Sequence, residues 1–199
     1  MPAPPRAPRT AAPKKQAPQA PPPSRKEQER KRVEKAAELC ADLISNGWQD
    51  TVADQIAAYA PTTWIRLRRS NHTQTCKALA RMASFVLRTK TLMHKGVGKL
   101  FGMLAGRLGA GDAVSAFAEE LASNIPLPTD AKMIAVARGL QMAGIVLCLM
   151  DGKDLDQCDC FVALVRAETE ERVKQILSAG MSNWVNLARF QPGATHASR

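Results

Sequence analysis

The chain of 199 residues has a formal net charge of +10, and 45% of its residues are hydrophobic although only 5% are aromatic. This length suits one globular domain with an additional segment, and a core built from Ala, Leu, Val, Ile and Met favours helices. Five cysteines, an odd number, and the lack of an apolar signal core near the N-terminus argue against a secreted disulfide framework. The longest apolar run, residues 142–150, is far shorter than the roughly 18 residues of a membrane span. We therefore expect a cytoplasmic or nuclear all-α protein with reduced thiols and no transmembrane segment.

The first 24 residues form a separate segment by composition. Nine of the thirteen prolines lie there, mixed with Ala and with the cations Arg6, Arg9, Lys14 and Lys15. Such a segment cannot bury enough apolar surface to offset its ordering entropy, so we expect a disordered Pro/Arg/Lys-rich N-terminal arm. Its composition is similar to that of the basic arms of viral coat proteins and DNA-binding proteins. It predicts an arm that neutralises phosphates, and the alternative is a solubilising linker.

A compact multi-helix domain is expected to follow over residues 25–190, with a loose tail over 191–199. Hydrophobic residues at helical spacing predict the helices, and Ser24, Asp50 and Asp112 are expected N-caps. Asn71 or Thr73 is expected to start another helix. Only Arg138 carries a charge between Met133 and Met150, which predicts that the helix over 130–150 is central and buried. The expected helices cover residues 25–45, 51–59, 62–69, 73–88, 113–123, 130–150 and 155–179, with a short one around Trp184.

The middle of the chain is strongly basic. Residues 55–111 contain ten Lys or Arg and no Asp or Glu, whereas residues 112–199 contain eight Lys or Arg and eleven acids. In the expected helix over 62–69, Arg66 and Arg69 share one face, and Trp64 offers a stacking contact for a base. The next helix carries cations at spacings of 4 and 7, which puts them on one stripe. The residues predicted to contact nucleic acid are Arg6, Arg9, Lys14, Lys15, Arg66, Arg68, Arg69, Lys77, Arg81 and Arg88, with Trp64 as the stacking residue.

Two alternatives remain for this basic region. The stripe could be an ordinary solvated helix face. Residues 51–69 also have the length of a helix-turn-helix, although Tyr59-Ala60-Pro61 stands where that motif often has a glycine.

Residues 92–108 combine cations, apolar residues and glycines. Gly98-Lys99 is not a phosphate-binding loop, because Met93 stands where the motif needs glycine and Leu100 follows the lysine. As a helix, the segment would be cationic and amphipathic, which suits an anionic membrane surface or a partner helix. Close packing of its small residues within the core is the simpler interpretation.

Candidate catalytic or metal-binding residues are sparse. Cys148, Cys158 and Cys160 are three thiols, but a structural zinc site needs four ligands, and the histidines are far away in sequence. We expect buried reduced thiols, with no metal and no cofactor. The remaining acids cluster on expected turns and exposed faces, and no catalytic constellation is evident. We therefore expect a protein that is not an enzyme.

These observations favour a non-catalytic nucleic-acid-binding protein whose arm and basic helices contact the phosphates of DNA or RNA. Packaging, in a coat- or nucleocapsid-like role, and a DNA-binding accessory role on a mobile element both fit the sequence. The apolar to mildly acidic part, residues 112–190, is expected to form the core and a self-association surface. The alternative function is a peripheral membrane or protein-interaction module that uses residues 92–108.

Overall fold

The computed structural model describes residues 23–90 and 110–187, and within these ranges it contains eight α-helices, one short 3-10 helix and no strand. The expected all-α class is confirmed. The first 22 residues of the expected arm, the segment 92–108 and the expected tail over 191–199 lie outside the described residues. The helices are α1 (Arg25–Ser45), α2 (Trp48–Tyr59), α3 (Pro61–Arg68), α4 (His72–Thr89), α6 (Gly111–Asn124), α7 (Thr129–Met150), η2 (Leu155–Gln157), α8 (Asp159–Ala167) and α9 (Glu170–Leu187).

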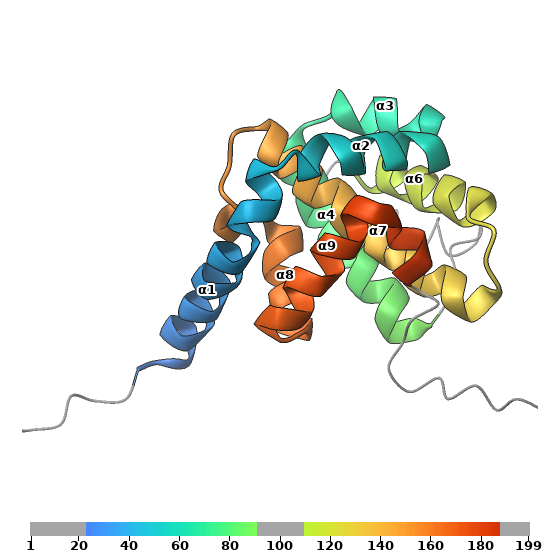
Figure 1. Ribbon diagram of the computed structural model, residues 1–199. Coiled ribbons are helices and arrows are strands. Elements are labelled where there is room, and N and C mark those ends of the chain that lie inside the picture. The colour runs from blue at the N-terminus through green and yellow to red at the C-terminus, as the bar shows by residue number, and fades with distance from the viewer. Residues whose placement is uncertain (1–22, 91–109, 188–199) are drawn as a thin grey trace, which may run out of the picture.

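Helix α7 runs through the centre of the molecule, and α2, α4, α6, α8 and α9 all pack against it (Figure 1). Leu140 and Ile145, on this helix, are completely buried. In the part of the chain that the structure describes, α7 is the one helix long and apolar enough to cross a membrane. However, 83% of its most apolar window is buried inside the protein, which identifies α7 as the core helix that the sequence predicts.

A glycine in α7 sets how closely three helices approach. A Cβ atom at Gly144 would lie 2.1 Å from Sγ and 3.0 Å from Cβ of Cys160 on α8, and 3.7 Å from Leu79 Cβ on α4. Replacing Gly144 would therefore force α8 away from α7. The Gly144 carbonyl also accepts a hydrogen bond from Cys76 Sγ at 3.3 Å. Glycine fits here because the Cys160 and Cys76 thiols pack directly against the backbone of α7, which leaves no room for a side chain.

The helix starts confirm some expected caps and correct others. Ser24 Oγ accepts from the Glu27 amide at 3.3 Å, and Asn71 Oδ1 accepts from the Gln74 amide at 3.1 Å, as an N-cap does. The expected caps Asp50 and Asp112 are wrong, because both lie inside the first turn of their helices. There they face the positive end of the helix dipole without capping it.

The expected single helix over 155–179 is wrong, because the chain forms η2, α8 and α9 instead. The break between α8 and α9 lies at Glu168, whose backbone is extended (φ −129°, ψ 163°). Two arginines from other helices bind Glu168 at this break. Arg138 Nη2 of α7 donates to Glu168 Oε1 at 2.5 Å, and Arg32 Nη2 of α1 donates to the Glu168 carbonyl at 3.1 Å. Contacts from distant helices thus interrupt a helical pattern that contains no proline or glycine at this point.

Near its C-terminal end, α9 contains a second interruption at Asn183, which has non-helical backbone angles (φ −174°, ψ 107°). Asn183 Oδ1 accepts from the Val185 amide at 3.0 Å and so begins a new turn. The carbonyls of Gly180 and Met181 accept instead from Gln55 Nε2 of α2, at 2.9 and 3.2 Å. The expected short helix around Trp184 therefore exists as the last turn of α9.

Candidate functional site

Helix α3 presents three arginines because its other face is fixed in the core. Thr63, Trp64 and Leu67 are buried, whereas Arg66, Arg68 and Arg69 are exposed. The Glu120 carboxylate of α6 accepts from the backbone amides of Thr62 (3.2 Å) and Thr63 (2.8 Å) and from the Thr63 hydroxyl. Burial of this carboxyl group would raise its pKa, but these hydrogen bonds outweigh burial and lower it. The N-terminus of α3 is thereby occupied by an internal anion.

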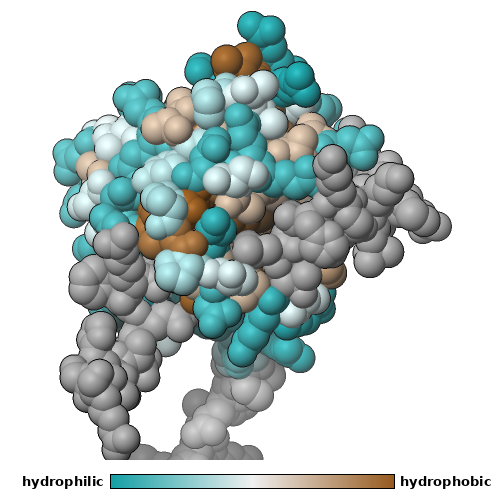
Figure 2. Space-filling model, turned by 90° about the vertical axis from the view of Figure 1, so that its right-hand side faces the viewer, coloured by the Kyte–Doolittle hydropathy of each residue, from teal (hydrophilic) through white to brown (hydrophobic). Residues whose placement is uncertain are grey.

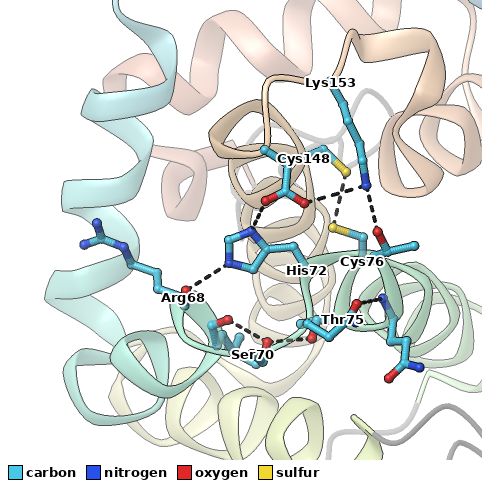
Figure 3. Close-up of polar contacts among 12 residues, drawn as sticks. Arg68, Ser70, His72, Thr75, Cys76, Cys148 and Lys153 are labelled. Atoms are coloured by element: carbon cyan, nitrogen blue, oxygen red, sulfur yellow. Dashed lines mark hydrogen bonds and ion pairs between the residues drawn. The ribbon is translucent and has the colours of Figure 1, made fainter.

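A short hydrogen-bonded corner joins α3 to α4 (Figure 3). Ser70 Oγ donates to the Leu67 carbonyl at 2.6 Å and lies 2.7 Å from Thr75 Oγ1. His72 Nε2 donates to the Arg68 carbonyl at 2.9 Å, while its Nδ1 lies 2.6 Å from Asp151 Oδ1 at the end of α7. The Arg68 guanidinium points away from this corner (Figure 3). The corner therefore holds the end of α3 against α4 and leaves the arginine side chains outside.

Helix α4 carries the second set of cations. Lys77, Arg81 and Arg88 are exposed, and the opposite face, which includes Leu79 and Val86, packs into the core. At a rise of about 1.5 Å per residue, the stripe from Lys77 to Arg88 is about 17 Å long. We refer to Arg66, Arg68, Arg69, Lys77, Arg81 and Arg88 as the α3–α4 surface.

None of the six cations of the α3–α4 surface forms an ion pair with another residue in the described ranges 23–90 and 110–187. This follows from the composition, because α3 and α4 contain no acid and the nearby carboxylates are engaged elsewhere. Glu120 caps α3, and Asp151 contacts His72 and Lys153. The structure thus shows six exposed cations on two consecutive helices, and none of them has an ion-pair partner among the described residues.

The expected stacking role of Trp64 is wrong for this structure. Its side chain is 2% exposed and packs beside Phe117 of α6, with ring centroids 6.2 Å apart. The ring therefore cannot meet a nucleic-acid base. The helix-turn-helix alternative also lacks support, since Ala60 alone connects α2 to α3, whereas that motif has a turn of three to four residues. The predicted arm cations Arg6, Arg9, Lys14 and Lys15 lie outside the described residues.

The surface offers few apolar contacts in the described ranges. The large hydrophobic side chains exposed there are Ile65 (52%) and Met150 (37%). On the face shown in Figure 2, hydrophilic residues cover most of the described surface, and apolar residues form small separate patches. The segment 92–108, on which the membrane alternative rests, lies outside the described residues.

A thiol cluster is the feature that sequence reasoning missed. Cys76 of α4 joins Cys148 of α7 and Cys158 and Cys160 at the start of α8, and all four are buried and free. Cys76 Sγ and Cys148 Sγ lie 3.2 Å apart. Cys158 Sγ donates to the Gly144 carbonyl at 3.7 Å, and Cys160 Sγ donates to the Cys76 carbonyl at 3.4 Å. The position of Cys76 on the buried face of α4 could be predicted from helical spacing. Its contacts with Cys148 and Cys160 could not, because these residues are 72 and 84 positions away in the chain.

The thiols of this cluster differ in acidity. The neighbouring Cys158 and Cys76 thiols, and more weakly the Lys153 ammonium group, stabilise a Cys148 thiolate and so lower the pKa of Cys148. The contact with Cys148, together with burial, raises the pKa of Cys76. Among the residues that the structure describes, no group of three or more His, Cys, Asp or Glu side chains has an arrangement that could hold a metal ion.

No family model, no curated protein sequence and no solved structure matches the chain.

Proposed function

We propose that this protein is a non-catalytic nucleic-acid-binding protein that contacts phosphates with the α3–α4 surface and with the basic N-terminal arm. The observation that carries this proposal is the set of six exposed cations without ion-pair partners in the described part of the chain. A cation without an acidic partner can pair with a phosphate without first breaking an ion pair inside the protein. Each phosphate that it neutralises releases counterions from the nucleic acid, and this release favours binding.

The geometry of α4 suits a phosphate backbone. Each strand of a duplex carries about one phosphate per 3.4 Å of the axis, so the stripe of about 17 Å from Lys77 to Arg88 would lie along about five phosphates of one strand. Three cations on such a stripe find partners in any base sequence. Since Trp64 is buried, the described residues supply charge without the stacking residue that we expected. The proposal is therefore backbone recognition with little sequence preference.

Both biological roles that fit the sequence use this kind of binding. Packaging of a genome needs contacts that do not depend on base sequence, and an accessory DNA-binding protein of a mobile element can use the same contacts to hold its substrate. DNA and RNA are both included, and location in the cytoplasm or the nucleus accompanies either role. Self-association belongs to this proposal, because packaging requires many copies on one nucleic acid.

The test is a salt series with matched triple variants of the full-length chain. The variant Lys77→Ala, Arg81→Ala, Arg88→Ala removes the α4 stripe. The slope of log affinity for duplex DNA against log salt concentration should become shallower by up to about 2.7, since each lost phosphate contact removes about 0.9 from the slope. The control Lys26→Ala, Arg30→Ala, Lys31→Ala removes the same charge from α1, where two of the three cations already have acidic partners.

The control variant should retain most of the parent slope, and circular dichroism should show that both variants are folded. In a chain lacking residues 1–22, the same slope should become shallower by up to about 3.6, the value expected when all four arm cations contact phosphates. Equal losses from the α4 variant and the α1 control would show that net charge alone acts, and would contradict a defined surface. If the intact protein ignores nucleic acid at low salt but binds anionic vesicles, the module built on residues 92–108 replaces this proposal.

A further inference from the structure

Cys76 and Cys148 form a contact between two thiols that come from different helices, α4 and α7. Cys76 Sγ and Cys148 Sγ are 3.2 Å apart, and each residue is 2% exposed. Cys158 and Cys160 are completely buried. A disulfide needs a sulfur–sulfur distance of about 2.05 Å, so the two atoms would have to close by about 1 Å. The first pair is therefore the one placed to react.

Polar residues lie near this pair. Figure 3 shows the Lys153 ammonium group beside the Cys76–Cys148 pair. Lys153 Nζ donates to Thr73 Oγ1 at 2.8 Å and lies 3.6 Å from Asp151 Oδ2. The neighbouring Cys158 and Cys76 thiols, and more weakly the Lys153 ammonium charge, stabilise a thiolate at Cys148, so the pKa of that thiol falls below its ordinary value. The thiolate is the reactive form of cysteine, and Cys76 stands next to it as a resolving thiol.

We propose that Cys148 and Cys76 are a peroxide-sensitive pair that closes to an intramolecular disulfide. The Cys148 thiolate attacks one oxygen of a hydroperoxide, its O–O bond breaks, and a sulfenic acid and a hydroxide ion form. The Cys76 thiol then attacks the sulfenic sulfur, the S–O bond breaks, and water leaves as the S–S bond forms. With hydrogen peroxide, two thiols give one disulfide and two waters, and the two electrons pass from sulfur to the peroxide oxygens.

Closure would couple oxidation to the arrangement of the helices. Cys76 and Cys148 are 72 positions apart in the chain, and their bond would fasten the first half of α4 to the end of α7. Cys76 immediately precedes Lys77 of the α3–α4 surface. The chemistry itself does not depend on the proposed function, and it is tested without nucleic acid.

The experiment uses the reduced full-length protein treated with stoichiometric hydrogen peroxide, blocked with an alkylating reagent, and digested with trypsin without reduction. Mass spectrometry should find the peptide 70–77 joined to the peptide 139–153. The peptide 154–166, which holds both Cys158 and Cys160, should remain alkylated. Cys40 is the internal reference, because burial raises its pKa to about 11. Cys148 should be oxidised before Cys40, because a larger fraction of the Cys148 thiol is thiolate at neutral pH.

Two serine variants separate the two steps. Cys148→Ser should leave Cys76 reduced, whereas Cys76→Ser should accumulate a sulfenic acid at Cys148 that dimedone traps. Cys40→Ser is the matched control and should close the disulfide at the parent rate. A bridge between the peptides 139–153 and 154–166 would overturn the assignment of Cys76. Oxidation that begins only in urea would show that the folded pair is inert, and stoichiometric zinc in the purified protein would mean that the thiols are metal ligands.

Discussion

Helix α1 and the α3–α4 surface are both rich in Lys and Arg, yet their cations have different surroundings. In α1, Lys31 lies 3.2 Å from Glu27, and Arg32 lies 2.9 Å from Glu170. On the α3–α4 surface, no cation has a carboxylate partner within the described residues. The placement of acids, rather than the number of cations, therefore decides which basic surface stays available to an anionic ligand.

The two regions also differ in what their cations hold together. Arg32 reaches across to α8 and α9, where it donates to the Val165 and Glu168 carbonyls at 3.0 and 3.1 Å. The side chains of the α3–α4 surface end in solvent. We therefore expect changes in α1 to alter stability and changes on the α3–α4 surface to alter binding.

The largest effect is expected at the boundary between surface and core. Trp64→Ala should lower the free energy of unfolding by about 3–5 kcal/mol, as removal of a buried aromatic side chain does. The neighbouring residue Ile65 is 52% exposed and provides the control. Ile65→Ala should change stability by less than about 0.5 kcal/mol in the same urea titration. A stable Trp64→Ala protein with weakened single-strand binding would restore the stacking role and extend the basic surface.

A smaller loss of stability is expected from α1. Arg32→Ala removes three hydrogen bonds to the α8–α9 connection and should cost roughly 1 kcal/mol, because the side chain is 46% exposed and solvent screens its charge. The control Lys26→Ala removes an exposed α1 cation that has no ion pair among the described residues. The salt dependence of nucleic-acid binding should be the same in both variants. A shallower salt slope of binding for Arg32→Ala alone would place this arginine in the nucleic-acid interface. It would contradict the expectation that α1 affects stability and not binding.

The pH dependence of stability should reveal the same pairing. The hydrogen bond from Arg32 holds the pKa of Glu170 below its usual range. A lowered folded-state pKa stabilises the protein above the unfolded value of about 4.3, and this contribution disappears as the pH falls through the folded-state pKa. Urea midpoints measured between about pH 5 and pH 3 should therefore fall less in Arg32→Ala than in the parent chain. Parallel pH profiles would mean that the pair contributes nothing.

The smallest effect on stability is expected on α4. Arg81→Ala should change the free energy of unfolding by less than about 0.5 kcal/mol, because the side chain ends in solvent. The same change should lower the salt slope of duplex binding by about 0.9. Arg30→Ala in α1 is the matched control and should leave that slope nearly intact. If the two variants lose equal slope, the ion pair of Arg30 does not distinguish α1 from the α3–α4 surface.

Local sequence patterns predict most of the helices but not every boundary. Asn71 caps α4 as expected, because its side chain meets an amide only three residues away. Asp50 and Asp112 look the same in sequence but lie inside the first turn, where an acid is also favourable, so the pattern cannot distinguish the two positions. The break at Glu168 depends on arginines from α1 and α7, which no local window contains.

The candidate site shows the same limit. The exposure of Arg66, Lys77 and Arg81 could be predicted from helical spacing, and the lack of nearby acids from composition. The burial of Trp64 could not, because it depends on Phe117, which lies more than fifty positions away. The contact between Cys76 and Cys148 is likewise a product of the packing of α4 against α7 around Gly144. Contacts between residues that are distant in the chain therefore could not be predicted from this sequence alone.

The corner between α3 and α4 has a thermodynamic consequence for any ligand that meets it. Ser70, Thr75 and His72 fix the angle between the two helices through contacts that need no ligand. The backbone is thus preorganised, and association would have to restrict only long side chains, at about 0.5–1.5 kcal/mol each. Binding should then resemble rigid docking, with a small change in heat capacity and an association rate governed by electrostatic steering.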